Sequence, residues 1–410
     1  MHRLSPSIEP AQARHLLERL GEAARAYRFE VAPNPCVGAA VLSGGEVIGQ
    51  GFHRAWGAAH AEVEALQAAS ASGVPRQEWD TLVVTLEPCS STGKTGPCVE
   101  AILEAGIPRV VVGALDPDPR HRGRGLERLS AAGVEVLVDP APAPLEQVAP
   151  HFLRWNERER VRRPRPWTVA KWAQTLSGQL RPPADVGEGR WISGAASLTE
   201  VQQLRARVDA IVTGVGTILA DDPRLTLRPS AAQAPARGAV PVPGSISGSV
   251  SAAATGAATV GGPAPVRVVL DSWLRTPPTA RLFAPCEGAE QAGKVIVVTL
   301  PGADPIRHRE LEAAGAEIVT SRGAKRHSLD LRGVWSGLWE RGLQRVMLEA
   351  GPTLLRNALD AGFVDQVRVY TGDVRGGEGE SLAGWLVEAP LEERLHRESG
   401  RDAVLEAFLP

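Results

Sequence analysis

The stretch from His60 to Cys98 constrains this chain most, because three of its residues can hold one metal ion. His60 opens a His-x-Glu step that ends at Glu62, and two cysteines, Cys89 and Cys98, each follow a proline. One imidazole and two thiolates form a zinc site whose remaining position stays open for water, whereas a closed structural site needs a fourth protein ligand. Only Cys36 could add a further thiol, and it is predicted to lie on a separate strand. We therefore predict a catalytic zinc site.

The residue types of this stretch also predict the reaction. Zinc lowers the pKa of a bound water to about 7, so that hydroxide is available at neutral pH. Glu62 lies two residues past His60, where a carboxylate that is not a ligand can carry the proton to a leaving amine, as in the zinc deaminases. Those enzymes have a tight Cys-x-x-Cys pair, whereas eight residues separate Cys89 from Cys98. Cys89 is predicted to end a strand and Cys98 to begin a helix, so the two cysteines can still share one site. The predicted reaction is the hydrolytic deamination of an aromatic nitrogen ring.

Length and composition limit the other possibilities. With 410 residues, the chain is long enough for two or three domains. Its net charge of -2 and its pI near 6.5 provide no broad basic surface for nucleic acid. Four cysteines favour a reducing compartment over a disulfide framework. Since the sequence shows neither a signal peptide nor a long apolar run, we expect a cytoplasmic protein with no membrane partner.

Residues 1–140 alternate between helical and strand patterns, which predicts an α/β domain with a mixed sheet. Expected helices cover residues 11–27, 60–69, 96–104 and 126–132, and expected strands cover residues 36–42, 46–49, 81–86, 109–113 and 134–138. The zinc ligands would then lie at helix starts, where the helix dipole favours thiolate over thiol.

The first half resembles the deaminase half of the bifunctional deaminase and reductase family of riboflavin biosynthesis. The matching motifs are Asn34-Pro35-Cys36-Val37-Gly38, Gly51-Phe52-His53, His60-Ala61-Glu62, residues 85–98, Ala105-Gly106-Ile107 and Asp116-Pro117-Asp118-Pro119. The resemblance implies a cytidine-deaminase-like three-layer domain and a diaminopyrimidinone substrate that carries a phosphoribosylamino group. It also implies that Asn34, His53 and Lys94 contact this small-molecule substrate. Ser91 and Asp118 depart from the family pattern, which has His and Asn there.

A boundary is expected at residues 141–165, a linker that begins in a proline-rich run and continues as a basic segment with a short helix. Glu157 and Glu159 interrupt the basic residues, so a solvated face explains this segment better than nucleic-acid binding. Residues 166–410 form the second predicted domain, with expected strands at 167–173, 210–214, 266–271, 294–299, 316–320, 346–350 and 364–370. Residues 230–264, rich in Ala, Gly, Ser and Pro, are predicted to be a flexible insertion in it.

Two segments of the second domain suggest a nucleotide site. Gly214 and Gly216 begin a dinucleotide fingerprint, but Leu219 stands where the third glycine belongs. After the strand 346–350, a helix starts at Gly351 and Pro352, and its exposed backbone N–H groups could bind phosphate. Taken alone, this pattern is also typical of a simple packing turn.

Together these segments resemble the reductase half of the same family, a dihydrofolate-reductase-like domain that uses NADPH. The resemblance rests on residues such as Lys171, Gly178, Ala220-Asp221-Asp222-Pro223 and Glu349-Ala350-Gly351-Pro352-Thr353. It implies NADPH contacts from Ala173, Trp191, Thr217, Asp221, Ser272, Gly351, Pro352, Thr353, Leu354, Leu355, Arg356 and Asn357. It implies substrate contacts from Gly189, Arg205, Leu225, Arg228 and Glu349, and a homo-oligomer formed through this domain. Arg205 and Arg228 would hold the substrate phosphate, and the protein would aim the nicotinamide hydride at the sugar C1.

Departures in the second half keep alternatives open. Ser177 stands where the family has an aspartate, and Leu198 where it has an arginine. One alternative is therefore a zinc deaminase whose second domain only binds a nucleotide. Another is a non-catalytic binding module with a structural metal. A nucleic-acid deaminase is disfavoured, because only 4% of residues are aromatic and the charge is balanced.

Overall fold

A computed structural model of the chain describes residues 8–91, 96–139, 145–161, 164–183, 192–228, 263–288, 290–325 and 328–410. They form two compact units that meet in the sequence at Arg158 and Glu159, inside the predicted linker. Three predicted site residues, Lys94, Gly189 and Trp191, lie outside the described residues, as does nearly all of the predicted insertion 230–264. Within the described ranges, no helix is both long enough and apolar enough to cross a membrane.

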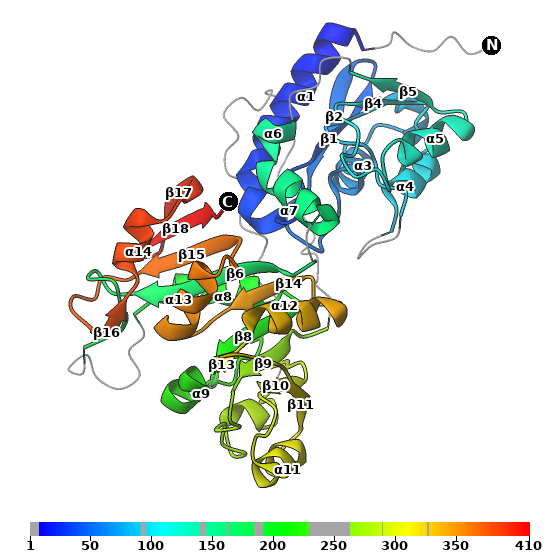
Figure 1. Cartoon of the computed structure of the whole chain (residues 1–410). Helices are drawn as coiled ribbons and strands as arrows, with labels where there is room; N and C mark the ends of the chain where they lie inside the picture. Colours follow the sequence, from blue (N-terminus) through cyan, green and yellow to red (C-terminus); the bar gives the residue numbers. More distant parts are fainter. Residues whose placement is uncertain are drawn as a thin grey trace. The chain divides into compact units, whose positions relative to one another are not determined.

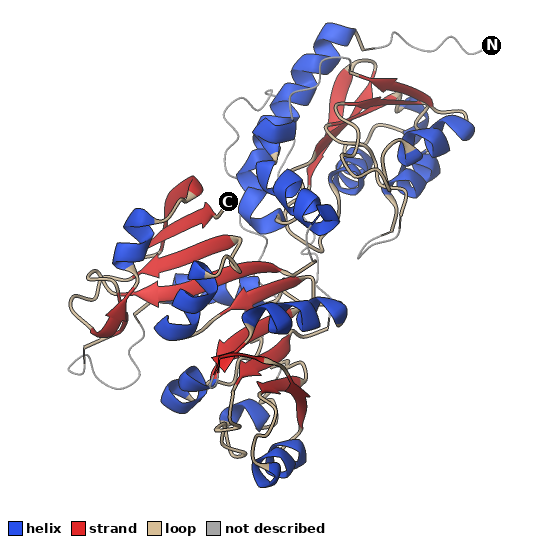
Figure 2. Cartoon of the chain, in the orientation of Figure 1, coloured by secondary structure: helices blue, strands red, loops and turns tan. Residues whose placement is uncertain are grey.

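The first unit is built on a five-stranded mixed sheet in the order β2-β1-β3-β4-β5 (Figures 1 and 2). β1 runs antiparallel to β2 and β3, whereas β3, β4 and β5 run parallel to one another. The strands are β1 (Gly38–Ser43), β2 (Glu46–Phe52), β3 (Thr81–Val84), β4 (Arg109–Val112) and β5 (Glu135–Val138). The helices are α1 (Pro10–Ala24), η1 (Arg25–Tyr27), α2 (Arg28–Val31), α3 (Ala61–Ala71), η2 (Arg76–Glu78), α4 (Cys98–Ala105), α5 (Arg124–Ala131), α6 (Leu145–Val148) and α7 (Pro150–Val161).

Helices cover both faces of this sheet. Successive strand residues point to opposite faces, and apolar residues on each face pack against helices. Val41 packs in a core with residues of α3 and α4. Its neighbour Leu42 packs in a second core with residues of α1 and α7. α3 lies close to β2 since Gly51 has no side chain there: an added Cβ would be 2.2 Å from the backbone nitrogen of Ala65. This contact fixes the helix whose start carries His60.

The second unit contains a nine-stranded sheet in the order β11-β10-β9-β8-β14-β6-β15-β18-β17. The pairs from β11 to β15 are parallel, and β18 and β17 are added as antiparallel strands. The strands of this sheet are β6 (Trp167–Gln174), β8 (Ala210–Gly214), β9 (Val266–Leu270), β10 (Val295–Thr299), β11 (Ala316–Thr320), β14 (Arg345–Leu348), β15 (Gln366–Thr371), β17 (Glu392–Ser399) and β18 (Asp402–Phe408). Two small sheets pair β7 (Gln179–Arg181) with β16 (Glu378–Ser381) and β12 (Gly323–Lys325) with β13 (Ser328–Leu329).

Helices also cover both faces of the nine-stranded sheet. α12 and α13 pack in the larger core, whereas α9 and α11 pack in a smaller one on alternate residues of β9 and β10. The helices are α8 (Ala195–Arg205), α9 (Val215–Asp221), η4 (Arg281–Phe283), α11 (Pro305–Ala313), α12 (Leu331–Glu340), α13 (Pro352–Asp360) and α14 (Ala383–Glu388). The strands and helices expected from the sequence all occur, with ends that differ by a few residues.

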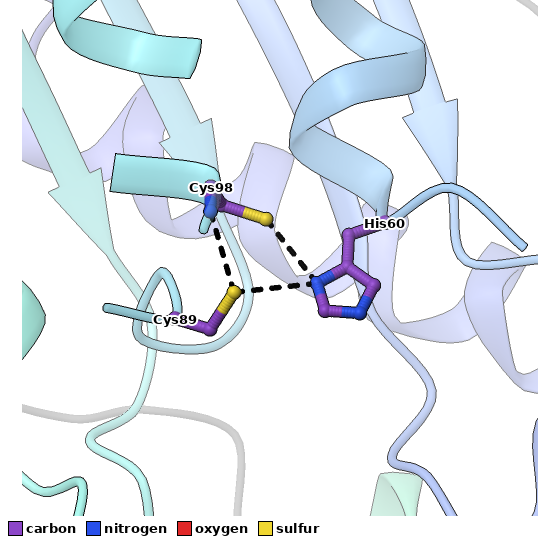
Figure 3. A group of neighbouring side chains, drawn as sticks. All are labelled: His60, Cys89 and Cys98. Atoms are coloured by element: carbon purple, nitrogen blue, oxygen red, sulfur yellow. Dashed lines mark hydrogen bonds between the residues drawn. The ribbon is translucent and has the colours of Figure 1, made fainter. Parts of the chain in front are cut away.

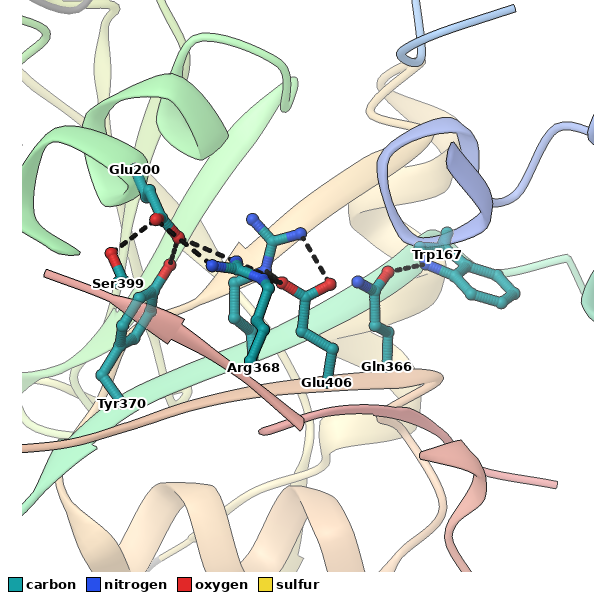
Figure 4. Close-up of polar contacts among 8 residues, drawn as sticks. Trp167, Glu200, Gln366, Arg368, Tyr370, Ser399 and Glu406 are labelled. Atoms are coloured by element: carbon teal, nitrogen blue, oxygen red, sulfur yellow. Dashed lines mark hydrogen bonds and ion pairs between the residues drawn. The ribbon is translucent and has the colours of Figure 1, made fainter. Parts of the chain in front are cut away.

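A largely buried ion network ties α8 to the end of the sheet (Figure 4). Arg397 of β17 pairs with Glu200 of α8 at 2.8 Å, and Arg368 of β15 pairs with Glu406 of β18 at 3.2 Å. Arg397 also binds Glu406, so two cations and two anions neutralise one another. Because each buried charge has a partner of opposite sign, the network can be accommodated between helix and strands.

Candidate functional site

The three predicted zinc ligands lie together in the first unit (Figure 3). His60 is the N-cap of α3, Cys98 is the first residue of α4, and Cys89 lies in the loop after β3. His60 Nδ1 is 3.2 Å from Cys98 Sγ and 3.5 Å from Cys89 Sγ. All three ligand atoms lie within 4.8 Å of one another. Since zinc binds sulfur at about 2.3 Å and nitrogen at about 2.0 Å, one ion fits among them.

The contacts between Cys89 and Cys98 favour the thiolate form of one of these two cysteines even without a metal. The Cys98 thiol donates to Cys89, and the Cys98 backbone N–H donates to Cys89 Sγ at 3.3 Å. These bonds outweigh burial and lower the pKa of Cys89 to about 4. The same contact, together with burial, raises the pKa of Cys98. The donor set fits zinc, because a metal-bound thiol is deprotonated and the ion would replace the proton that the two sulfurs share.

Glu62 lies in the first turn of α3, two residues after His60, and its side chain is buried. Burial raises the pKa of Glu62, while the charge of His60 opposes this shift. A buried carboxyl group with a raised pKa beside a metal site is suited to general acid and base catalysis. Glu62 thus lies beside the metal ligands, and its role as the proton carrier stays a prediction.

Two predicted substrate contacts lie next to the ligands. Asn34 Nδ2 is 3.2 Å from His53 Nε2, and His53 Nδ1 is 3.0 Å from the carbonyl oxygen of Ala59. A carbonyl only accepts, so Nδ1 carries the proton and Nε2 accepts from the Asn34 amide. The His53 ring meets the His60 ring edge-on, with 5.2 Å between their centroids. Asn34 and His53 are thus connected to the metal site.

Glu87, to which the sequence analysis assigned no role, organises the loop beside Cys89. Its carboxylate is buried and accepts three backbone N–H groups, from Asp116 at 3.1 Å, Gly123 at 2.9 Å and Gly125 at 3.0 Å. Asp118, where the family has Asn, pairs with Arg120 in the same loop, and this bond lowers the pKa of Asp118 to about 2. A glutamate just before the Pro-Cys pair was visible in the sequence, but its backbone partners were not.

The predicted reductase residues gather where parallel strands of the second unit end. Ala173 lies near the end of β6, Thr217 lies in α9 just after β8, and Ser272 follows β9. The residues from Gly351 to Asn357 follow β14, with Gly351 as N-cap of α13 and Pro352, Thr353, Leu354, Leu355, Arg356 and Asn357 in the helix. The Gly351 N–H donates to Thr217 Oγ1 at 3.1 Å. Ligands of open α/β sheets bind at this edge, outside the carboxyl ends of the strands.

A charged cluster lies at the same edge. Glu349 accepts from Arg205 and from Lys171, whose Nζ is 3.3 Å from Glu349 Oε1. Burial opposes ionisation of Glu349, but the charges of Arg205 and Lys171 outweigh it and lower the pKa of Glu349 to about 2. Arg205 also donates to the carbonyl oxygen of Thr226. Arg205 thus binds protein acceptors here, and its predicted contact with the substrate phosphate stays a prediction.

The remaining predicted residues of this half take different positions. Leu225 is buried with a φ of 53°, Asp221 ends α9, and Arg228 is exposed at the end of a described range. Ser177, one of the two departures, accepts the Gly376 N–H at 3.0 Å. Ser177, at the position where the family has an aspartate, therefore still accepts a hydrogen bond from the segment before β16.

A His-Cys-Cys metal site at helix starts of one α/β unit, followed by a second α/β unit with a ligand edge, defines a two-domain enzyme of the zinc deaminase class. Residues 11–114 match the family model of the cytidine and deoxycytidylate deaminase zinc-binding region, and residues 166–402 match the RibD C-terminal domain. The riboflavin biosynthesis protein RibD of Aquifex aeolicus is 32% identical over 365 residues, covering 88% of this chain and 87% of the relative. That of Escherichia coli is 33% identical over 361 residues, with the same coverage of 88% and 87%. The chain belongs to the RibD family of riboflavin biosynthesis proteins.

Solved structures agree with this assignment. The Acinetobacter baumannii RibD structure, form 1, has a TM-score of 0.60 at 27% identity and covers 98% of this chain and 99% of its own. The diaminohydroxyphosphoribosylaminopyrimidine deaminase/5-amino-6-(5-phosphoribosylamino)uracil reductase of Thermotoga maritima gives the same TM-score of 0.60 at 27% identity, with 98% and 99% covered. The predicted fold class, α/β with a cytidine-deaminase-like and a dihydrofolate-reductase-like domain, is confirmed.

Proposed function

We propose that this chain is a bifunctional enzyme of riboflavin biosynthesis. It removes the amino group of a diaminopyrimidinone ribose phosphate by zinc-dependent hydrolysis, and it then reduces the ribose to a ribityl chain with NADPH. The observation that carries the first step is the convergence of His60, Cys89 and Cys98 beside the buried Glu62. Membership of the RibD family over both units carries the second step.

The residues of the first unit divide the work of deamination. Zinc, when bound, supplies the activation of water and the stabilisation of developing charge. Glu62 takes a proton and returns it to the leaving amine, which its buried position beside His60 supports. Asn34 and His53 bind and orient the pyrimidine ring, and Lys94 binds the ribose phosphate.

The residues of the second unit bind and orient the reductase substrates. The start of α13, with Ala173, Trp191, Thr217, Asp221 and Ser272, holds NADPH. Lys171 and Glu349 lie at the same edge as Gly351, where the sugar would meet the nicotinamide. NADPH supplies the hydride for C1, and Gly189, Arg205, Leu225 and Arg228 complete the substrate site. We also propose that the enzyme works in the cytoplasm as a homo-oligomer formed through this unit.

An assay with the phosphoribosylaminopyrimidine substrate tests both steps. Zinc-loaded protein should release ammonia without NADPH, and NADPH absorbance should then fall when the cofactor is added. Absence of both signals would defeat the proposal. Glu62→Gln should abolish ammonia release while zinc stays bound, whereas a non-catalytic binding module would keep its function in this variant.

The second candidate is a zinc deaminase with an inactive, nucleotide-binding second unit, which Ser177 and Leu198 favour. Purified deaminated intermediate distinguishes the two. NADPH oxidation with this intermediate supports the bifunctional enzyme, and NADPH binding without oxidation supports the alternative.

A further inference from the structure

His151, a residue of α7, reaches the deaminase site from the far end of the first unit's sequence. Its side chain is fully buried, and its Nε2 lies 2.9 Å from the backbone carbonyl oxygen of Asn34. Because the carbonyl only accepts, Nε2 carries the proton and donates. The two residues are separated by 117 positions in the sequence. α7 is thus tied to the turn that carries Asn34.

The Asn34 backbone is held on both sides. Its N–H donates to the carbonyl oxygen of Val31 at 3.0 Å, which closes a turn. Its carbonyl precedes Pro35, outside the strands, and His151 supplies its hydrogen bond. A part-buried carbonyl that loses such a donor must turn toward another partner. The direction of the Asn34 Cα–Cβ bond therefore depends on His151.

The Asn34 side chain connects the Asn34 backbone to the metal ligands through His53. Its Nδ2 donates to His53 Nε2 at 3.2 Å, while the Ala59 carbonyl fixes the other ring nitrogen of His53 at 3.0 Å. The ring of His53 meets the ring of the ligand His60. Since Nδ2 is engaged, Oδ1 is the atom of Asn34 suited to accept an amino N–H of the pyrimidine.

We propose that His151 is a positioning residue of the deaminase: it fixes the Asn34 backbone and thereby aims the Asn34 amide at the pyrimidine. The inference rests on the proposed deaminase function and adds a residue to it. If this inference holds, the deaminase site needs a hydrogen-bond donor at position 151 and does not need the imidazole ring itself.

The surroundings of His151 suit a neutral donor. Burial lowers the pKa of His151 to about 4, with further lowering by the charges of Arg154 and Arg28. The imidazole is therefore uncharged at neutral pH and still has one N–H to donate. Gln can supply a neutral N–H of similar reach, whereas Leu fills similar space without a donor.

The test compares His151→Gln and His151→Leu in the full chain, with Phe152→Leu as control. Phe152 is a buried neighbour on α7, so its truncation loosens the same helix while leaving the His151 donor in place. For ammonia release, His151→Leu should raise the substrate KM about tenfold, the effect of one lost hydrogen bond to a part-buried acceptor. His151→Gln and Phe152→Leu should stay within about twofold of the unchanged enzyme, and zinc content should be equal in all four proteins.

An unchanged KM in His151→Leu would overturn the inference, as would an equal rise in KM in all three variants. If the unchanged enzyme releases no ammonia, the proposed function fails, and hydrogen exchange of residues 31–36 then decides the positioning role. Faster exchange in His151→Leu than in His151→Gln and Phe152→Leu supports positioning of Asn34. Equal exchange in the three variants overturns it.

Discussion

The guanidinium of Arg205 donates to both carboxylate oxygens of Glu349, at 2.9 Å each, across 144 positions of the sequence. Lys171 adds a second cation to the same carboxylate. Glu349 therefore holds two side chains from different elements at the edge where we place the reductase substrate.

Replacing this carboxylate should damage the second unit. Glu349→Gln leaves Arg205 and Lys171 beside each other without an anion, which should cost about 3 kcal/mol of unfolding free energy. Thermal unfolding and NADPH oxidation with the deaminated intermediate measure the effect. Glu388→Gln, an exposed acid on α14, should change neither quantity. Unchanged stability in Glu349→Gln would contradict this account.

Removal of one sulfur ligand should empty the metal site. Cys98→Ser replaces a thiolate by a weak ligand, so zinc content should fall from about one ion per chain to near zero. Metal analysis of the purified protein checks this, and ammonia release should disappear together with the metal. Cys36→Ala removes another buried cysteine, which lies outside the ligand group, and should keep its zinc. Zinc retained in Cys98→Ser would refute the ligand set.

The hydroxyl of Thr217 should matter for the cofactor. Thr217→Val removes the acceptor of the Gly351 N–H and so releases the start of α13. We expect the Kd for NADPH to rise about fivefold, the equivalent of one hydrogen bond. Titration of NADPH fluorescence measures this Kd. Thr217→Ser keeps the hydroxyl and should bind normally, and a normal Kd in Thr217→Val would show that this contact does not support the cofactor site.

Acid should weaken the first unit through His151. Its pKa falls from 6.5 to about 4 on folding, so the unfolded chain binds the proton more readily. Stability is therefore lost as the pH drops below 6.5 and levels off below about 4. Between pH 7.5 and pH 5, the unchanged protein should lose about 2 kcal/mol more unfolding free energy than His151→Gln. Urea unfolding at the two pH values measures the difference, and Phe152→Leu should retain the full pH dependence. If the unfolding free energy of the unchanged protein, His151→Gln and Phe152→Leu changed equally between the two pH values, His151 would not be a neutral buried imidazole.

Much of the fold was readable in the sequence because local patterns determine it. The strand 81–86 before Cys89 and the helix near Cys98 follow from apolar periodicity, and the metal ligands follow from residue types that few other sites combine. The expected helix 126–132 differs at both ends from the observed α5, which runs from Arg124 to Ala131, since helix ends depend on tertiary contacts.

What the sequence could not reveal are partners that lie far apart along the chain. Neither the bond of His151 to Asn34 nor that of Arg205 to Glu349 has a local signal. The hairpin of β17 and β18 was also missed. β17 reads Glu-Glu-Arg-Leu-His-Arg-Glu-Ser, a polar run without the alternation of a half-buried strand, because it is the outer strand of the sheet.

The place of β6 in the large sheet has a consequence for how the second unit acquires its structure. β6 is the unit's first strand in the sequence, yet its neighbours are β14 and β15, which begin at Arg345 and Gln366. The middle of the sheet can therefore assemble only after a long intervening segment has been made and brought back. Contacts of such high sequence separation slow folding, and during that delay the apolar strands in between remain open to aggregation.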